Sequence, residues 1–313
     1  SLARLRVLDL ESSELTDASP LASLTGLQGL NLTAAKLRDL DFVQMMTSLE
    51  WVTLRADPRT SLAPLWSRTQ LKSLAIQVDE SSDLSGLAHL TGLASLDLYT
   101  DASHLPRMLL PSTTTSLSLW STGALASVAN LPVAPQLTDL WIWMAHDLRS
   151  LHGVEGLTGL TTLTVQDSPF SDLAALKGLT GLRKLEVYGG AVSDLTPIAG
   201  LTRLTTLGIS TNHISDLNPL RRLLRLTSLE ANSNRISDAS PLANTKTLER
   251  LWLDDNQLRD LSAFAGWKTS IRATNQTIVE GTKAVVGVPV AFGIRNQAGQ
   301  PLCPHAPAAR VSC

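Results

Sequence analysis

A segment of roughly 22 residues repeats through most of this chain, a length typical of leucine-rich repeats, and its clearest copy is LTRLTTLGISTNHISDLNPLRR, positions 201–222. The repeats begin at Leu2, Leu24, Met46, Arg68, Leu90, Pro111, Ala134, Leu157, Leu179, Leu201, Leu223 and Thr245. Their spacing is constant except between Leu90 and Leu157, where it is first shorter and then longer by a single position, so the centre is irregular. A repeat of this length holds one short strand and one return segment, and it folds only when stacked on its neighbours.

Within each repeat the seventh and ninth residues are apolar, as in Leu207 and Ile209, and they alternate with more polar neighbours. This two-residue period is typical of a half-buried strand. The sixth, eighth, tenth and eleventh residues then lie on the outer face of the sheet. We therefore predict an α/β leucine-rich-repeat solenoid of about twelve repeats. It is a right-handed horseshoe with a concave parallel β-sheet and short helical or 3-10 segments on its convex side.

Two polar positions predict how the chain leaves each strand. The twelfth residue is Asn in Asn212, Asn234 and Asn256, where an amide can satisfy backbone groups that the strand leaves open; earlier repeats have Ser13, Asp57 and Asp79 there. A Ser/Thr-Asp pair follows at the fifteenth and sixteenth positions, as in Ser215-Asp216, and is predicted to cap a short convex turn. A calcium array is the alternative, but one carboxylate per coil lacks the dense oxygen cluster that calcium requires.

The repeat register continues to about residue 266, which predicts one elongated domain over 1–266 and a C-terminal cap over 267–313. The net charge of −2 gives no basic field for nucleic acid or an anionic membrane, and no stretch is long and apolar enough to enter one. Because Ser1-Leu2 falls directly on a repeat, we expect a segment upstream of it. Cys303 and Cys313 lie in the tail, and the sequence leaves their pairing open.

The pattern LxxLxxLxLxxNxIxDxxPL, complete or nearly so in residues 201–222 and 223–244, resembles the bacterial internalin-type leucine-rich repeats. The likeness covers about residues 2–266 and is most specific in the last four repeats. The segments IRATNQTI (271–278) and VPVAFGIRNQAGQP (288–301) resemble the start of an immunoglobulin-like cap. The resemblance implies a secreted or wall-anchored bacterial surface protein that binds a partner on its concave face.

Aromatic residues concentrate on that face. Seven of the nine Trp and Tyr residues fall at sixth, eighth or tenth positions, namely Trp51, Tyr99, Trp120, Trp141, Trp143, Tyr188 and Trp252. Tyr99, Trp120 and Trp143 share the tenth position in successive repeats, which predicts a contiguous strip with Trp141 beside it and Tyr188 further along. Exposed Trp and Tyr clusters are common anchors of protein interfaces. A purely structural ladder of cross-strand ring pairs is the alternative.

The charges at the sixth, eighth, tenth and eleventh positions are mostly acidic. Nine acids (Asp9, Glu11, Asp97, Asp139, Asp167, Glu186, Glu230, Asp254 and Asp255) face three bases (Arg55, Lys184 and Arg250). This favours a partner with basic or hydroxyl-rich groups over a phosphate backbone. The predicted ligand-binding residues are Trp51, Arg55, Asp97, Tyr99, Trp120, Asp139, Trp141, Trp143, Lys184, Glu186, Tyr188 and Trp252.

Signals for catalysis are weak, because the six histidines show no metal-ligand spacing and no nucleophile elbow or P-loop occurs. We therefore expect no enzyme activity, no metal and no cofactor. The favoured function is an extracellular recognition and adhesion module that binds a protein on a host or neighbouring cell through the aromatic face. The alternatives are a glycan-binding surface module, an intracellular scaffold or regulatory subunit, and a spacer between other domains.

Overall fold

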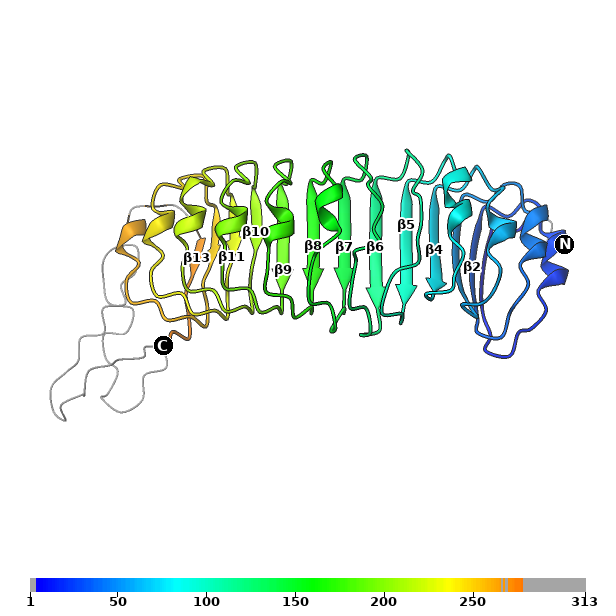
Figure 1. Cartoon of the computed structure of the whole chain (residues 1–313), viewed down its shortest axis with the longest axis horizontal. Coiled ribbons are helices and arrows are strands. Elements are labelled where there is room, and N and C mark those ends of the chain that lie inside the picture. Colours follow the sequence, from blue (N-terminus) through cyan, green and yellow to red (C-terminus); the bar gives the residue numbers. More distant parts are fainter. Residues whose placement is uncertain (1–3, 266, 268–269, 278–313) are drawn as a thin grey trace. The chain divides into compact units, whose positions relative to one another are not determined.

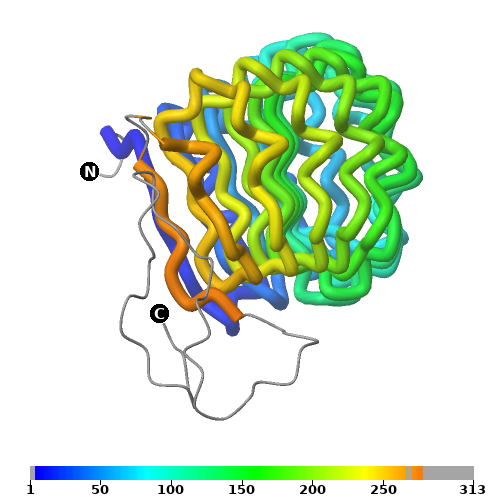
Figure 2. The backbone as a smooth tube through the Cα atoms, turned by 90° about the vertical axis from the view of Figure 1, so that its left-hand side faces the viewer, coloured from blue at the N-terminus to red at the C-terminus, as the bar shows by residue number. Residues whose placement is uncertain are grey.

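The protein was analysed as a computed structural model that describes residues 4–265, 267 and 270–277. Its internal contacts divide it into two compact units, Ser1–Ser168 and Pro169–Cys313. In each unit every repeat makes one coil, and successive coils stack (Figure 2). The predicted cap beyond residue 277, with Cys303 and Cys313, lies outside the described residues, so its boundary at 266 stays a prediction.

All strands are parallel and follow the order of the sequence, which confirms the predicted solenoid (Figure 1). The first unit holds β1 (Val7–Glu11), β2 (Gly29–Ala34), β3 (Trp51–Ala56), β4 (Ser73–Val78), β5 (Ser95–Thr100), β6 (Ser116–Ser121), β7 (Asp139–Trp143) and β8 (Thr162–Gln166). The second holds β9 (Lys184–Tyr188), β10 (Thr206–Gly208), β11 (Ser228–Glu230), β12 (Arg250–Trp252) and β13 (Ser270–Arg272). Equivalent repeat positions pair, as in Leu207↔Leu229, and β13 is one strand more than the twelve repeats predicted.

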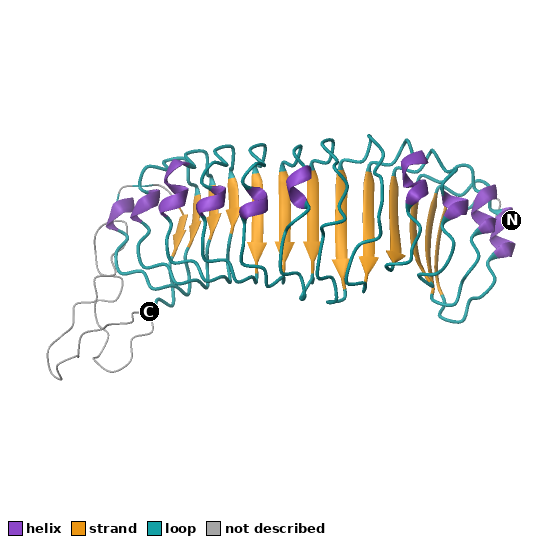
Figure 3. Ribbon diagram, viewed as in Figure 1, coloured by secondary structure: helices purple, strands orange, loops and turns teal. Residues whose placement is uncertain are grey.

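Most return segments contain a 3-10 helix (Figure 3). These helices are η2 (Ser19–Ser23), η3 (Asp41–Met45), η4 (Ala63–Leu65), η5 (Ser85–His89), η6 (Val154–Gly156), η7 (Ala174–Leu176), η8 (Thr196–Ile198), η9 (Asn218–Arg222), η10 (Ser240–Leu242) and η11 (Ser262–Phe264). The predicted capping Asp is present, but it acts one residue earlier than a normal N-cap. Asp216, for example, accepts the Asn218 backbone N–H at 2.8 Å, while the N-cap residue itself is Leu217.

The core of each coil is made of the repeated leucines. Leu207, Leu229 and Leu251 hold the same strand position in three coils, and all three are fully buried. Burying such a side chain contributes about 1.5–3 kcal/mol to stability. The apolar periodicity in the sequence therefore decides which face of every strand points inward.

In the second unit, a column of amide side chains, which we call the amide ladder, bonds the backbone where the chain leaves each strand. The Asn212 side chain donates to the carbonyl oxygens of Val187, Ile209 and Ser210 and accepts the Val192 N–H. Asn234 and Asn256 repeat this pattern, and Gln276 extends it. Each amide thus satisfies backbone groups of its own coil and of the preceding one, as the sequence predicts.

The repeats that begin at Leu90 and Pro111 differ from the rest on the convex side. Their return segments contain no 3-10 helix, and isolated parallel bridges join Leu84 to Met108 and His104 to Ser127. A groove of about 600 Å³ lies there, with Leu109 and Val133 exposed in its wall. The irregular spacing at the centre of the sequence therefore marks a real change in the convex structure.

Candidate functional site

Four side chains on the outer face of the first unit form one stacked row. The Tyr99 and Trp120 ring centroids are 6.2 Å apart with an interplanar angle of 24°, and those of Trp120 and Trp143 are 5.3 Å apart at 16°. The Arg55 guanidinium carbon lies 4.3 Å from the Tyr99 centroid, at the other end of the row. We call Arg55, Tyr99, Trp120 and Trp143 the aromatic ladder.

The register of the strands accounts for this row. Tyr99 pairs with Trp120 and Trp120 with Trp143, so the three rings are neighbours in the hydrogen-bonding direction. Each of the three rings is half-buried. Tyr99 in β5 and Trp120 in β6 each lie between two fully buried residues, and Trp143 in β7 follows buried Ile142. Because the rings stack face to face, their edges rather than their faces point toward solvent.

Polar residues and one further indole lie beside the ladder. Asp97 in β5 and Trp141 in β7 occupy the eighth position of their repeats, and Asp139 in β7 occupies the sixth. The Asp139 carboxylate accepts a hydrogen bond of 2.6 Å from Thr138. Trp141 is half-buried and stacks on no other ring among the described residues. The predicted residues Arg55, Asp97, Tyr99, Trp120, Asp139, Trp141 and Trp143 therefore share one face.

Two predicted site residues pack over glycines instead. The Trp51 indole of β3 covers Gly29, and the Tyr188 ring of β9 covers Gly208, so a Cβ at either glycine would overlap the ring. The Tyr188 hydroxyl also donates to Glu230 at 3.4 Å. Burial, reinforced by the Glu186 and Glu230 carboxylates, raises the pKa of Tyr188 well above its ordinary value. These two rings contribute to packing between neighbouring strands.

The other predicted residues of the second unit form charged pairs. Lys184 and Glu186 are 3.0 Å apart, and Arg250 lies 3.7 Å from Glu230. The guanidinium carbons of Arg250 and Arg272 each lie 5.0 Å from the Trp252 ring centroid. Sequence analysis missed Arg272, because it belongs to a thirteenth strand that the repeat pattern did not predict.

Comparison with known proteins supports the repeat assignment. The family model described as leucine-rich repeats, two copies, matches residues 224–266. The chain has the leucine-rich-repeat fold. Its fold is similar to that of the internalin InlF from Listeria monocytogenes, with 24% identity, a TM-score of 0.62, and 88% of this chain and 83% of that chain covered.

Two further structures superpose less well. They are internalin C2 from Listeria monocytogenes (25% identity, TM-score 0.41, 81% of this chain and 84% of that chain) and a leucine-rich-repeat protein from Leptospira interrogans (19%, 0.43, 83% and 81%). No curated protein matches the sequence.

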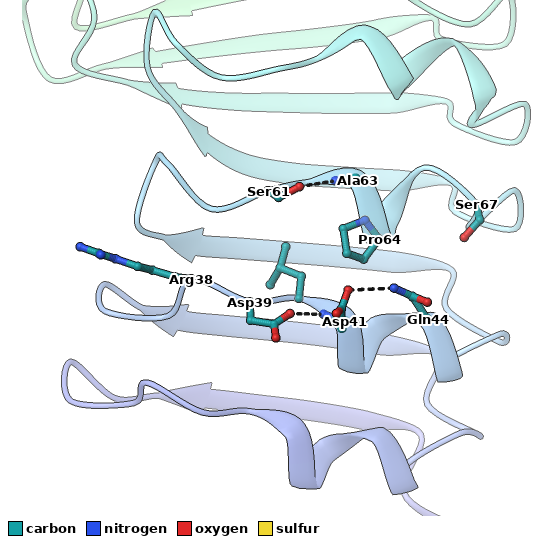
Figure 4. A pocket seen from close by; sticks show the side chains of 9 residues that line it. Arg38, Asp39, Asp41, Gln44, Ser61, Ala63, Pro64 and Ser67 are labelled. Atoms are coloured by element: carbon teal, nitrogen blue, oxygen red, sulfur yellow. Dashed lines mark hydrogen bonds between the residues drawn. The ribbon is translucent and has the colours of Figure 1, made fainter.

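A shallow hollow on the convex side of the leucine-rich repeats shows how their turns are built. It has a volume of about 380 Å³ and lies between η3 and η4 (Figure 4). Asp39 accepts the Asp41 N–H at 2.7 Å, Asp41 accepts from the Gln44 amide at 2.8 Å, and Ser61 accepts the Ala63 N–H at 3.4 Å. These polar groups thus form hydrogen bonds within the turns.

Neither metal sites nor membrane spans are found in the described part of the chain. Within residues 4–265, 267 and 270–277, no three His, Cys, Asp or Glu side chains are grouped so as to hold a metal ion. The same residues contain no helix with the length and apolar character needed to cross a bilayer.

Proposed function

We propose that this leucine-rich-repeat protein is a non-catalytic recognition module that binds a partner protein through the aromatic ladder and the residues beside it. The observation that carries the proposal is the row of half-exposed rings on the outer face of the first unit. Trp, Tyr and Arg are the residue types that most often dominate binding energy at protein interfaces. Packed side by side they are already ordered, so binding costs little conformational entropy.

The stacking geometry favours a protein over a glycan at the ladder itself. A sugar ring stacks on an exposed aromatic face, whereas both faces of Trp120 are covered by Tyr99 and Trp143. Apolar ring edges and an arginine suit the side chains of a protein surface, and Asp97 and Asp139 suit a partner that presents basic groups.

The repeat resemblance and the similarity in fold to InlF support a bacterial cell-surface or secreted location, with the partner on a host or neighbouring cell. Recognition of this kind requires no cofactor and no chemical step. The mode of attachment to the cell and the identity of the partner are not part of the proposal.

The test is binding of the fluorescently labelled chain to intact epithelial and bacterial cells, measured by flow cytometry. Trp120→Ala with Trp143→Ala is expected to weaken binding by at least about tenfold, because each buried anchor contributes about 2 kcal/mol and about 1.4 kcal/mol corresponds to a factor of ten. Trp252→Ala, in the second unit, is the matched control and should leave binding unchanged. Circular dichroism checks that every variant is folded.

Pretreatment of the cells separates the possible partners. Trypsin should abolish binding of the unaltered chain, whereas glycosidases should leave it intact. Unchanged binding of the double variant would contradict the proposed site, and trypsin-resistant binding would contradict a protein partner.

One observation favours a glycan as the second candidate. Trp141 has no stacking partner among the described residues, and the partly exposed Ser118, which carries a hydroxyl, pairs with it in the strand register. A sugar ring could stack there while the Ser118 hydroxyl binds its rim. Binding to a glycan array that is lost in Trp141→Ala but retained in Trp120→Ala with Trp143→Ala would favour this alternative.

A further inference from the structure

The second unit concentrates positive charge on one corner, where each 3-10 segment turns back into the sheet. This corner comprises residues 173–183, 195–205, 217–227 and 239–249, which contain one acid, Glu249, and seven basic side chains. The seven are Lys177, Arg183, Arg203, Arg221, Arg222, Arg225 and Lys246. The corner therefore has a net charge of +6 in a chain whose net charge is −2. We call these seven residues the basic corner.

The opposite corner of the same unit, where the chain leaves the strands, is acidic. Residues 168–172, 190–194, 212–216, 234–238 and 256–260 hold five aspartates against two arginines. These aspartates are engaged as acceptors at the turns, as Asp194 and Asp238 are with the N–H groups of Thr196 and Ser240. No comparable structural role accounts for the bases on the other corner.

All seven basic side chains are exposed, and none forms an ion pair with a carboxylate of the described residues. Lys246 contacts the Trp267 ring, with its ammonium nitrogen 4.3 Å from the centroid. The charges therefore remain uncompensated within the unit. Like charges held close together repel one another, so this arrangement is one that an anionic ligand would stabilise.

The coils hold two of these side chains in register. Arg203 and Arg225 occupy the same repeat position in adjacent coils, three residues before the paired Thr206 and Ser228. The Thr247 hydroxyl donates to the carbonyl oxygens of Leu224 and Leu226 at 3.0 and 2.6 Å. These bonds hold the turn that contains Thr247 against the turn that contains Arg225. With strands about 4.8 Å apart, the four coils of the basic corner span about 14 Å.

We propose that the basic corner binds a linear sulfated polysaccharide. Five of its seven bases are arginines, whose planar guanidinium groups form paired hydrogen bonds to sulfate oxygens. Exposed hydroxyls of Thr180 and Thr202 lie at the second position of their repeats, next to the bases, where they suit the polar rim of a sugar chain. This site is separate from the aromatic ladder, and it does not depend on the function proposed for that ladder.

The composition of the corner argues against two other anionic partners. Its four segments contain no aromatic residue on which nucleic-acid bases could stack, and the Trp267 ring beside them has the Lys246 ammonium group over its face. Leu224, which is 51% exposed, is its one large exposed apolar residue among those described, too little to insert into a membrane surface.

The experiment uses heparin as the sulfated probe and measures its affinity for the full chain by isothermal titration calorimetry at several salt concentrations. The variant Arg203→Gln, Arg222→Gln, Arg225→Gln is compared with Arg107→Gln, Arg149→Gln, Arg235→Gln. Both remove three exposed arginines and change the net charge equally. The corner variant should bind heparin at least about tenfold more weakly, with a slope of log Kd against log salt reduced by about 2–3. The control variant should behave like the unaltered chain.

Other outcomes would overturn the proposal. Absence of heparin binding, or equal losses in both triple variants, would contradict a specific site. Equally tight binding to oligo-dT, or to vesicles made of phosphatidylserine and phosphatidylcholine in equal parts, lost in the same corner variant, would replace the polysaccharide by nucleic acid or membrane. Trp120→Ala with Trp143→Ala should retain heparin binding, so failure of this site and failure of the proposed function are distinguishable.

Discussion

At the tenth position of the repeat, the last strands of the first unit and those of the second differ in chemistry. In the first unit, Tyr99, Trp120 and Trp143 hold this position, and their rings stack on the outside of the sheet. From β10 onward in the second unit, the position is held by Ser210, Asn232 and Asp254. There, Ser210 Oγ accepts the Asn232 N–H, and the Asn232 and Asp254 side chains accept the N–H groups of Asp254 and Thr274.

The length of the strands explains this difference. Strands β2–β6 are six residues long, so their tenth residue is still in the sheet, whereas β10–β12 contain three residues. In the second unit, amide side chains donate hydrogen bonds to the carbonyl oxygen of the ninth residue. Asn212 and Asn234, for example, both donate to the Ile209 carbonyl oxygen. The chain then turns through a positive φ at Thr211, Ser233 and Asp255. The later repeats thus stabilise their strand exits with amide side chains, whereas β5 and β6 stay extended through the tenth residue.

The largest effect is expected from breaking the amide ladder. Asn234→Leu leaves the buried Ile214 N–H without its acceptor and removes a hydrogen bond to the Ile209 carbonyl oxygen. Each unsatisfied buried group costs about 1–3 kcal/mol, so the free energy of unfolding should fall by about 2–5 kcal/mol in urea titrations. Asn244→Leu, on the exposed surface of the same unit, is the control, and similar losses in both would refute this role.

A smaller loss should follow from filling the space under Tyr188. In Gly208→Ala, the new methyl group would displace the ring and its bond to Glu230, lowering the free energy of unfolding by about 1–3 kcal/mol. Tyr188→Ala should remove most of this penalty in a double-mutant cycle. Gly200→Ala, where a Cβ meets nothing within 4 Å, serves as the control. Additive effects of Gly208→Ala and Tyr188→Ala would show that the two residues are not in contact.

The aromatic ladder should show a direct energetic coupling. In a cycle of Trp120→Ala and Trp143→Ala, the coupling free energy should be about 0.5–1.5 kcal/mol, since stacked aromatic pairs contribute this much beyond buried area. The pair Trp120→Ala and Trp252→Ala should show none. A coupling indistinguishable from zero in the first pair would mean that the rings do not stack in solution.

The smallest effect concerns the turn carboxylates, which both units share. Hydrogen bonds from Ser19, Ser85 and Thr196 lower the pKa values of Asp17, Asp83 and Asp194. A lowered folded-state pKa stabilises the protein above the unfolded value, near 4, and this stability is lost as the pH falls through the folded-state pKa. The melting temperature should therefore be level from pH 7 to 5 and drop below about pH 4. Asp194→Asn should flatten that drop, and a steeper drop in the variant would contradict the assignment.

Much of this architecture could be predicted from the sequence, because it depends on local periodicity. The repeated leucines predicted which face of each strand is buried. The amide ladder was predicted from Asn212, Asn234 and Asn256, and the row of rings from the shared repeat position of Tyr99, Trp120 and Trp143. Side-chain directions could not be predicted in the same way. Whether a ring stacks on a ring, as Trp120 does, or covers a glycine, as Trp51 and Tyr188 do, depends on the neighbouring strand. Gly29 lies opposite Trp51, whereas Gly208 lies opposite Glu186, two residues before Tyr188.

The basic corner was missed for a related reason. Its bases occupy several repeat positions, so no single column of the repeat is basic, and the net charge of −2 conceals them. Summing charge separately over the turn before the strand and the turn after it would have found this asymmetry.

The central claim is that the tenth position faces outward in the first unit and is tied into the structure in the second. Thiol labelling tests it directly, using Trp120→Cys and Asp254→Cys in a chain whose Cys303 and Cys313 are replaced by serine. Asp254 is 3% exposed, whereas Trp120 is half-buried at the surface. We predict rapid maleimide labelling at position 120 and labelling at position 254 only at the rate of local unfolding. Equally rapid labelling at both positions in folded protein would contradict the account.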